Sequence, residues 1–286
     1  MHFVGTRHGA SLLITFMSNT YTQQVVIVTG AGAGIGFALC KAFAQAGATV
    51  ALNDLNPTLA KSAAQQINDE VKRDAVVGLP FDVADVQAVR LAVTDVALRF
   101  GRVDVAIANA GLTNYGSFLE YTPEAFDRLM NVNLRGSYFL AQAAAREMVA
   151  RKQPGRILLM SSATGNRAFT NLSAYGTTKA GLQHMARTLA LELGPYNITV
   201  NAIAPGAILT ERTLKDDPMF AENWAGVTPI KRSGTVEDVA AMVLFLTSPA
   251  AQFVNGQTLI IDGGWSLASP LPEAHPAKPD AGSKLV

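Results

Sequence analysis

The chain has very little of what disulfide bridges and metal sites are built from. Its 286 residues include one cysteine, Cys40, and four histidines. A lone cysteine excludes an internal disulfide framework and is typical of a reducing compartment, so we expect a cytoplasmic protein in which Cys40 is a buried structural thiol. Because the histidines are scattered without the spacing of metal ligands, we predict no metal site.

An excess of charge and a long apolar run are missing too. The chain has 23 basic and 22 acidic residues, a net charge of +1 and no basic cluster, which argues against nucleic acid as a partner. Although 49% of the residues are hydrophobic, the apolar stretch 11–17 is too short to cross a bilayer or to form the core of a signal peptide. We therefore expect neither nucleic acid nor a membrane as a partner.

What the chain does contain is an alternation of short apolar runs and helix-length segments. Seven runs have the length and composition of buried strands: 24–29, 49–53, 75–79, 103–108, 156–160, 198–203 and 258–261. Helical patterns between them predict an α/β, doubly wound Rossmann fold, with one seven-stranded parallel sheet and helices on both faces. We find no internal boundary, so we expect a single domain over residues 23–267.

The two ends of the chain do not share this alternation. Residues 1–22 match nothing that follows, and we expect an N-terminal extension without a role in the fold, with Met17 as an alternative start. Residues 268–286 are rich in proline, alanine and charge, and such a stretch would not build a core of its own. We expect a proline-rich tail there.

A glycine-rich loop joins the first predicted strand to the first predicted helix. It reads Gly-Ala-Gly-Ala-Gly-Ile-Gly over residues 30–36. In such a loop, backbone N–H groups and the positive end of the helix can hold a diphosphate. The spacing is GxxxGxG rather than the usual GxGxxG, and a tight turn without a ligand is the alternative.

The acidic residue Asp54 follows the second predicted strand, about 20 positions beyond the glycine loop. A carboxylate in this place can accept hydrogen bonds from the ribose hydroxyls of adenosine, and it would repel a 2′-phosphate. No Arg or Lys stands in the loop or directly after Asp54 to offset that repulsion, which favours NAD over NADP. The alternative is a capping role, because Asn56 and Pro57 open the next helix.

Three side chains between residues 162 and 179 have the chemistry of proton transfer. Tyr175 and Lys179 are four positions apart, so they lie one turn apart on one helix face. An ammonium group there favours the phenolate and lowers a phenol pKa that is ordinarily about 10. Ser162 stands at the end of the apolar run 157–160. Together these side chains can hold an alcohol or carbonyl oxygen and move its proton, although a Tyr-x-x-x-Lys pair alone is common on ordinary helices.

In this arrangement the sequence resembles the short-chain dehydrogenase/reductase family over about residues 24–265. The motifs that carry the resemblance are TGAGAGIG at 29–36, NAG at 109–111, NVNL at 131–134, Ser161-Ser162, YGTTK at 175–179, PG at 205–206 and DGG at 262–264. Each motif is unspecific alone, whereas the set in this order is specific. The family usually has two asparagines in the NAG motif, where this chain has Ala108-Asn109.

The resemblance implies a catalytic group of four residues. Tyr175 would be the general acid/base, and Lys179 would lower its pKa and bind the nicotinamide ribose. Ser162, rather than Ser161, would hold the substrate oxygen. Asn133 would hold a water that links Lys179 to the solvent, and packing at a helix kink is the alternative for Asn133.

The resemblance also implies the cofactor contacts. Asp82 and Val83 would contact the adenine, residues 109–111 would line the adenosine side, and the segment 205–210 would fix the nicotinamide amide through Ile208 and Thr210. The full set expected to bind NAD, with NADP less favoured, is Gly30, Gly34, Ile35, Gly36, Asp54, Leu55, Asp82, Val83, Asn109, Ala110, Gly111, Tyr175, Lys179, Pro205, Gly206, Ile208 and Thr210.

The expected reaction is hydride transfer that interconverts a secondary alcohol and a ketone, or a sugar hemiacetal and a lactone. Polar residues between 162 and 175 suit a sugar or polyol as the small-molecule substrate. The segment 210–234 has weak periodicity, and we expect it to cover the cleft as a lid. Its Met219, Phe220 and Trp224 would form a wall over the substrate or anchor the lid to the protein or to a neighbouring subunit. The expected substrate contacts are Ser162, Thr164, Tyr175 and Trp224.

Two other functions stay open. A 3-oxoacyl-thioester (acyl carrier protein) reductase is the alternative within the family, but such enzymes usually prefer NADPH and have a basic residue in the glycine loop, where this chain has Ala33. A dinucleotide-sensing scaffold without turnover is the alternative from another class, and it predicts decay of the reaction centre. The family usually pairs its two long helices, here 124–150 and 174–193, across subunits, so we expect a homotetramer.

Overall fold

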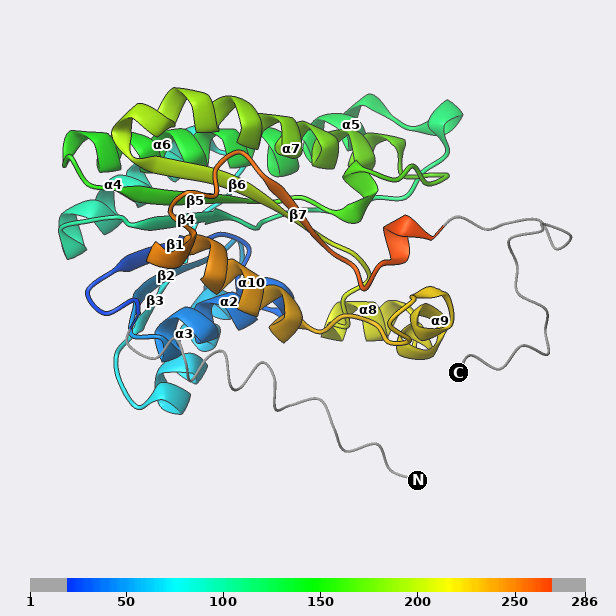
Figure 1. The fold of residues 1–286 in the computed structure, drawn as a ribbon, viewed down its shortest axis with the longest axis horizontal. Coiled ribbons are helices and arrows are strands. Elements are labelled where there is room, and N and C mark those ends of the chain that lie inside the picture. The colour runs from blue at the N-terminus through cyan, green and yellow to red at the C-terminus, as the bar shows by residue number, and fades with distance from the viewer. Residues whose placement is uncertain (1–19, 269–286) are drawn as a thin grey trace, which may run out of the picture.

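The alternating pattern of the sequence corresponds to a parallel sheet within residues 20–268, the part of the chain that the computed structural model describes (Figure 1). The strands are β1 (Val25–Val28), β2 (Thr49–Asp54), β3 (Val76–Pro80), β4 (Val105–Ala108), β5 (Gly155–Met160), β6 (Ile198–Pro205) and β7 (Thr258–Ile261). They pair in parallel in the order β3-β2-β1-β4-β5-β6-β7. The predicted seven-stranded, doubly wound sheet is therefore confirmed.

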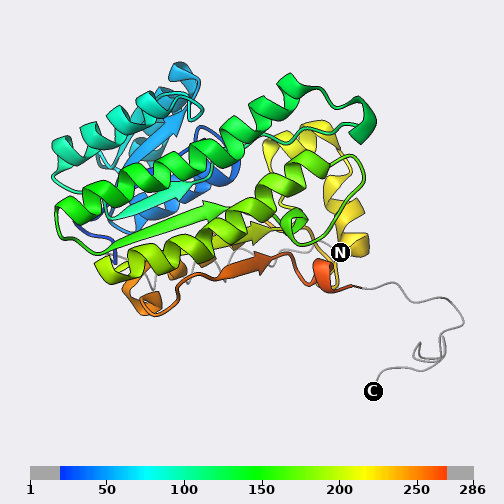
Figure 2. The ribbon, with the colours of Figure 1, turned by 90° about the horizontal axis from the view of Figure 1, so that it is seen from above.

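Helices cover both faces of this sheet (Figures 1 and 2). They are α2 (Gly34–Gln45), α3 (Pro57–Val71), α4 (Val86–Phe100), α5 (Pro123–Met130), α6 (Ser137–Ala150), α7 (Ser173–Leu193), α8 (Glu211–Asp216), α9 (Phe220–Val227) and α10 (Val236–Thr247). One apolar core joins the sheet to α2, α3 and α10, and a second core on the opposite face joins it to α4, α6 and α7. The central strands β1 and β4 face both cores, which explains why every residue of each is buried and why they read as continuous apolar runs.

The order of the strands places a crevice next to β1. The chain passes from β1 outward to β2 and β3, and it then returns to the other side of β1 as β4. The connections that leave β1 and β4 therefore run to opposite faces of the sheet, and they separate beyond the carboxyl ends of the two strands. In open parallel sheets this is the position where ligands bind.

The long helix expected over residues 122–150 is interrupted. It begins at Thr122, whose hydroxyl accepts a hydrogen bond from Ala125 N, and it changes to a π-helical turn between α5 and α6, over Asn131–Gly136. The extra residue in this turn directs the Asn133 side chain toward the segment after β4, where it bonds to the backbone of Leu112. Such π-bulges often mark functional sites.

The segment 210–234, which lacks clear periodicity in the sequence, contains the two short helices α8 and α9. Both are too short to show a repeating apolar face, so the sequence pattern did not predict them. The Thr210 hydroxyl accepts a hydrogen bond from Thr213 N, and the Thr210 N–H donates to the Thr213 hydroxyl, which fixes the start of α8. Figure 2 shows α8 and α9, in yellow, beyond the carboxyl ends of the strands.

The described residues can be compared with the predictions for Cys40, for membrane spans and for metal sites. Cys40 is completely buried in α2, and burial raises the pKa of its thiol, as is expected for a structural cysteine. Within residues 20–268, no helix has the length and apolar character needed to cross a membrane, and no group of three His, Cys, Asp or Glu side chains is arranged to hold a metal ion.

The expected boundary between extension and domain needs a correction at Tyr21. Residues 1–19 lie outside the described residues, but Tyr21, which the sequence placed in the extension 1–22, is fully buried. Its hydroxyl donates to the Leu244 carbonyl and lies 2.8 Å from Thr247 Oγ1, and its ring meets Phe43 edge-on at 4.9 Å. The polar sequence around Tyr21 concealed this contact, because the hydrogen-bond partners of its hydroxyl are more than 200 positions away. The packed fold therefore includes Tyr21.

We expect Tyr21 to contribute measurably to stability. Tyr21→Ala removes a buried aromatic ring from the contact between α2 and α10, so the free energy of unfolding should fall by about 3–5 kcal/mol. Tyr21→Phe removes only the hydroxyl hydrogen bonds and should cost about 1 kcal/mol. Equilibrium unfolding in urea measures both changes.

The half-exposed tyrosine Tyr196 provides the matched control for this comparison. Tyr196→Ala should lower the unfolding free energy by less than about 1 kcal/mol, as is usual for surface substitutions. An unfolding free energy that is the same for Tyr21→Ala as for Tyr196→Ala would show that Tyr21 is not part of the folded core.

Candidate functional site

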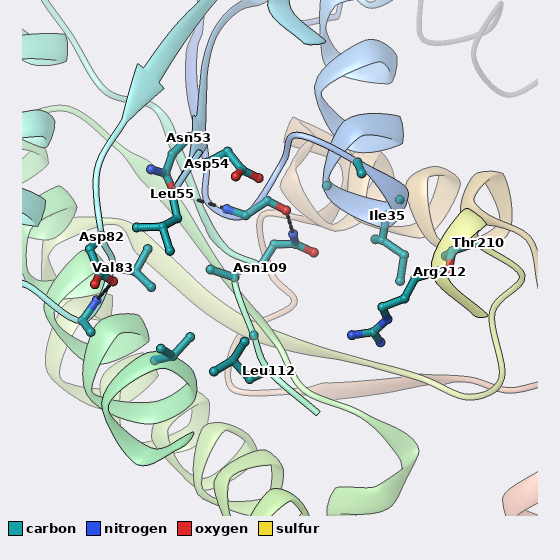
Figure 3. Close-up of a pocket in the computed structure, with 18 of the residues that line it drawn as sticks. Ile35, Asn53, Asp54, Leu55, Asp82, Val83, Asn109, Leu112, Thr210 and Arg212 are labelled. Atoms are coloured by element: carbon teal, nitrogen blue, oxygen red, sulfur yellow. Dashed lines mark hydrogen bonds between the residues drawn. The ribbon is translucent and has the colours of Figure 1, made fainter. Parts of the chain in front are cut away.

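A pocket of about 1010 Å³ lies at the carboxyl ends of β1 to β4, in the crevice that the strand order predicts (Figure 3). Its walls come from the glycine loop after β1, the segments after β2, β3 and β4, the end of α5 with the π-helical turn, and the start of α8. The lining residues that the sequence predicted for the cofactor are Gly30, Gly34, Ile35, Gly36, Asp54, Leu55, Asp82, Val83, Asn109, Ala110, Gly111 and Thr210. The pocket thus gathers residues from six separate parts of the sequence.

The glycine loop lies against the segment after β4 at backbone distance. Gly30 has a φ of +59°, and a Cβ atom built on it would be 2.6 Å from the Cα of Ala110. A Cβ on Gly36 would be 2.5 Å from the Gly30 carbonyl oxygen. Asn109 Nδ2 donates to the carbonyls of Thr29 and Gly30, at 2.9 Å each. No side chain therefore fits at Gly30 or Gly36, and Asn109 holds the loop in place.

Asn53 and Asp54 fix the other side of the glycine loop. Asn53 Oδ1 accepts from Gly30 N at 3.2 Å, while its Nδ2 donates to the carbonyls of Leu79 and Phe81. The Asp54 carboxylate accepts hydrogen bonds from Gly32 N at 3.1 Å and from Asn56 N at 2.9 Å, and it also lines the pocket. The cap of α3 is Asn56, whose side chain accepts from Thr58 N and Leu59 N, so the capping alternative for Asp54 is wrong, and the Asp54 carboxylate holds the loop and lines the pocket.

The part of the pocket near Asp54 is a slot between apolar side chains. Figure 3 shows Leu55, Asp82 and Val83 in the same region of the pocket as Asp54. Val83 is buried, Leu55 is 63% exposed, and the Asp82 carboxylate accepts a hydrogen bond from Ala84 N. Apolar side chains with carboxylates beside them can accept a heterocyclic base and its ribose.

Some of the predicted cofactor residues lie outside the wall of this pocket. These are Tyr175, Lys179, Pro205, Gly206 and Ile208. Ile208 packs its side chain into the core and pairs its backbone with Gly234. Only its backbone is therefore available to a ligand.

The lysine and tyrosine of the reaction centre adjoin the pocket at Gly111. Lys179 is buried, and its Nζ donates to the Met160 carbonyl at 2.8 Å and lies 5.5 Å from the centre of the Tyr175 ring. A Cβ atom built on Gly111 would be 3.3 Å from Lys179 Nζ and 3.5 Å from Asn133 Oδ1. Gly111 lines the pocket, so only its backbone separates the pocket from the lysine.

Burial sets the protonation behaviour of Lys179. Removal of the ammonium group from water lowers the pKa of Lys179 below its ordinary value, and the charge of Tyr175 opposes this effect in part. The hydrogen bond to the Met160 carbonyl uses one of the three donors of the ammonium group. The remaining donors are available to neighbours on the Tyr175 and Gly111 sides.

The two serines after β5 differ in what their hydroxyls do. Ser161 is buried; its Oγ donates to the Lys179 carbonyl at 2.8 Å and accepts from Gln183 Nε2 at 3.0 Å. The Ser162 hydroxyl accepts a hydrogen bond from Thr164 N and, among the described residues, donates none. Ser161 therefore joins β5 to α7, whereas the hydroxyl hydrogen of Ser162 is not used by any described residue.

Asn133 is completely buried in the π-helical turn, and the protein occupies its side chain. Its Oδ1 accepts from Leu112 N at 2.8 Å, and its Nδ2 donates to the Leu112 carbonyl and to the Thr178 hydroxyl. The Asn133 carbonyl accepts from the Ser137 hydroxyl. The packing alternative for this residue thus describes its side chain well, and the bonds to Leu112 and Thr178 connect the segment after β4 with α7.

The expected substrate residues lie in two places. Thr164, in the short turn after β5, has a buried hydroxyl without a hydrogen-bond partner among the described residues. Trp224, in α9, packs edge-on against Trp265 at 5.2 Å, and Phe169 stacks on the same indole at 5.2 Å. Trp224 therefore packs α9 against the segment after β7, and its role as a wall over the substrate stays a prediction.

The pocket also contains charged residues that the motifs did not indicate. Arg128 reaches it from α5, and Glu211, Arg212 and Lys215 reach it from α8. The glycine loop has no basic residue, as the sequence showed, but basic side chains approach the same pocket from helices that are distant in the sequence. Arg212 stands two positions after Thr210, and that proximity to a predicted cofactor residue is the one signal that could have identified it.

Comparisons with known proteins agree with this arrangement. A family model described as Enoyl-(Acyl carrier protein) reductase matches residues 30–266. Versicolorin reductase stcU of Emericella nidulans is 36% identical over 256 residues, which cover 84% of this chain and 95% of that protein. The NAD-dependent glycerol dehydrogenase of Listeria innocua is 36% identical over 247 residues, which cover 86% of this chain and 95% of that protein.

Solved structures show the same similarity. The crystal structure of a gluconate 5-dehydrogenase from Burkholderia cenocepacia in complex with NADP and tartrate superposes with a TM-score of 0.82 at 34% identity, and the match covers 89% of this chain and 100% of that chain. The match to the family model over most of the chain, together with these identities, shows that the chain belongs to the short-chain dehydrogenase/reductase family of NAD(P)-binding oxidoreductases.

Proposed function

We propose that the protein interconverts a secondary alcohol and a ketone, or a sugar hemiacetal and a lactone, with Ser162, Tyr175, Lys179 and Asn133 as its reaction centre. The observation that carries this proposal is the position of the buried Lys179 amine. It lies 5.5 Å from the Tyr175 ring centre and directly behind Gly111, a residue of the dinucleotide-sized pocket. A phenol beside an amine, next to the wall of such a pocket, has the chemistry of a general acid/base.

The residues of the pocket fit a nicotinamide dinucleotide. Gly30 and Gly36 leave no space for side chains, so the backbone of the loop itself forms the wall at the start of α2, where N–H groups can meet a diphosphate. The slot of Leu55, Asp82 and Val83 suits the adenine, and the Asp54 carboxylate suits the ribose hydroxyls. When bound, the nicotinamide accepts or supplies the hydride.

The side chains of the reaction centre then handle the oxygen and its proton. The free donor of the Ser162 hydroxyl holds the substrate oxygen, and the Tyr175 phenolate takes the alcohol proton. The Lys179 ammonium stabilises that phenolate and binds the nicotinamide ribose. Asn133 fixes the backbone of Leu112 beside Gly111, and a water held near Asn133 connects Lys179 with the solvent.

NAD is the proposed preferred cofactor. The Asp54 carboxylate at the edge of the pocket supports it, since a 2′-phosphate on the adenosine ribose would meet a like charge. The glycerol dehydrogenase relative is named NAD-dependent, whereas the gluconate 5-dehydrogenase structure contains NADP, so relatives of similar identity use either cofactor. The local charge at Asp54 therefore carries the proposal.

A sugar or polyol is the proposed substrate class. The glycerol and gluconate dehydrogenases among the relatives support it, as does the unpartnered Thr164 hydroxyl close to Ser162 in the sequence. A 3-oxoacyl-thioester reductase is the second candidate within the family, and the neutral Ala33 in the glycine loop argues against its usual NADPH preference. A scaffold without turnover is disfavoured because the four residues of the reaction centre are present.

The remaining proposals concern the lid, the assembly and the compartment. The segment 210–234 would act as a lid over the substrate, with Trp224 at its fixed end. Exposed apolar side chains on α4 (Leu91 and Leu98) and on α6 (Tyr138) support pairing of subunits into a homotetramer. A reducing compartment such as the cytoplasm fits the single buried cysteine.

Loss of the Tyr175 hydroxyl should abolish turnover and preserve cofactor binding. Tyr175→Phe removes the proton acceptor but keeps the ring beside Lys179, so we expect kcat to fall by about 10²-fold or more. NAD affinity, measured by quenching of tryptophan fluorescence, should change less than about threefold. Initial rates of NAD reduction with a panel of sugars, polyols, secondary alcohols and acyl thioesters provide the activity measurement.

Tyr196→Phe is the matched control, since Tyr196 is exposed in the turn between α7 and β6 and does not line the pocket. It should retain wild-type kcat. Full activity of Tyr175→Phe would contradict the proposed acid/base role, and the absence of turnover by the wild type with every alcohol, ketone and thioester would favour the scaffold.

Removal of the Asp54 charge should relax the cofactor preference. Asp54→Asn keeps an oxygen that can accept one of the two backbone hydrogen bonds and removes the repulsion toward a 2′-phosphate, so the ratio of kcat/KM for NAD to that for NADP should fall about tenfold or more. The measurement is made with one substrate and both cofactors.

Asp95→Asn, which neutralises an exposed carboxylate on α4, is the control and should leave the ratio unchanged. A wild-type enzyme that favours NADP, or an Asp54→Asn variant with the wild-type ratio, would contradict the role given to Asp54.

A further inference from the structure

We propose that Arg212 of α8 is the cationic partner of the cofactor diphosphate and holds it against the glycine loop from the opposite wall of the pocket. The proposal rests on the proposed function, because it takes the pocket to be the site of a dinucleotide. It adds a binding residue that the motifs of the chain do not indicate.

The position of Arg212 places its side chain where a diphosphate would bind. Arg212 lines the same pocket as Ile35 and Thr210, and Figure 3 shows its guanidinium group extending into the pocket next to Ile35. Thr210 caps α8 through its bonds with Thr213, and its methyl carbon lies 3.7 Å from the Cβ position of Gly34. The cap thus holds the start of α8 beside the first residue of α2, where the loop N–H groups can meet a diphosphate.

The charged residues of the pocket wall leave few candidates for a cation at the diphosphate. A diphosphate diester carries two negative charges, but the glycine loop and the first turn of α2 offer only neutral N–H donors. The charged residues of the pocket wall are Asp54, Asp82, Arg128, Glu211, Arg212 and Lys215. Asp54 and Asp82 lie toward the adenosine slot, so a cation for the diphosphate must come from α5 or α8.

The chemistry of the side chain distinguishes Arg212 from the other two cations. A guanidinium group can donate two parallel hydrogen bonds to phosphate oxygens, which a lysine cannot. Within residues 20–268, Arg212 makes no ion pair or hydrogen bond through its side chain, so its donors are available. Lys215 is three residues farther along α8 from the Thr210 cap, and Arg128 stands on α5 with Asn131 and Val132.

A contact of this kind connects cofactor binding with the lid. α8 is followed directly by α9, whose Trp224 packs on Trp265. A diphosphate held between Arg212 and the start of α2 would therefore restrain α8 against the glycine loop whenever the pocket is occupied. Release of the cofactor then requires the contact between Arg212 and the diphosphate to break.

Binding of cofactor fragments tests this proposal without reference to turnover. ADP-ribose contains the diphosphate and adenosine does not. Isothermal titration calorimetry gives the ADP-ribose affinity, and ligand-observed NMR gives the weaker adenosine affinity, for the wild type, Arg212→Gln and Arg212→Lys. We expect Arg212→Gln to weaken ADP-ribose about tenfold or more and to leave adenosine unchanged, because the loss of a charge-assisted hydrogen bond affects only the diphosphate. Arg212→Lys should be intermediate.

The salt dependence and a charge-matched control complete the test. The ADP-ribose affinity of the wild type should fall more steeply with NaCl than that of Arg212→Gln. Arg146→Gln, which removes an exposed positive charge from α6, should behave as the wild type in both measurements.

The outcomes separate this proposal from the proposed function. Equal ADP-ribose affinity of Arg212→Gln and wild type, or an equal loss for adenosine, would overturn the role of Arg212. If the wild type binds ADP-ribose but turns over no alcohol, the proposed reaction fails and the role of Arg212 is still decided by the variants. If the wild type binds no ADP-ribose, the dinucleotide site and the role of Arg212 fail together.

Discussion

The contact between the glycine loop and the segment after β4 is the constraint on which the rest of the site depends. Gly30 lies so close to the backbone of Ala110 that no side chain fits between the two segments, and Asn109 joins them through its bonds to the carbonyls of Thr29 and Gly30. The two segments touch at Gly30 and separate beyond it. The pocket opens between them, at the place where the strand order changes direction from β1 to β4. The same segment after β4 continues to Gly111 and thereby places the pocket beside Lys179.

One face of α7 carries the helical residues of the proposed reaction centre. Tyr175, Lys179 and Gln183 follow one another at intervals of four residues and therefore share a helix face. Gln183 donates to the Ser161 hydroxyl, the Ser162 carbonyl and Asn166 Oδ1, so it ties the end of β5 to the same helix that carries the tyrosine and the lysine. The relative position of Ser162 and Tyr175 thus depends on buried hydrogen bonds as well as on the sheet.

The sequence predicted the features that local chemistry determines. Apolar runs of strand length located the sheet, and the glycine loop and Asp54 located part of the pocket wall, while the Tyr-x-x-x-Lys pair indicated the proposed reaction centre beside it. The features it did not predict depend on distant partners. Tyr21 bonds to Leu244 and Thr247, and Arg212 joins the pocket because the segment after β6 brings Thr210 beside Gly34. The short helices α8 and α9, with six and eight residues, carry too few positions for a recognisable period.

Proton transfer by Tyr175 requires that the nicotinamide end of the cofactor meets this residue beside Gly111. A crystal structure of the protein with NAD and a substrate analogue tests this most directly. We expect the diphosphate on the glycine loop, the nicotinamide ribose at Lys179 Nζ, and the Tyr175 and Ser162 hydroxyls on one oxygen of the analogue. A dinucleotide bound elsewhere, or a Tyr175 hydroxyl turned away from the nicotinamide ring, would contradict the account.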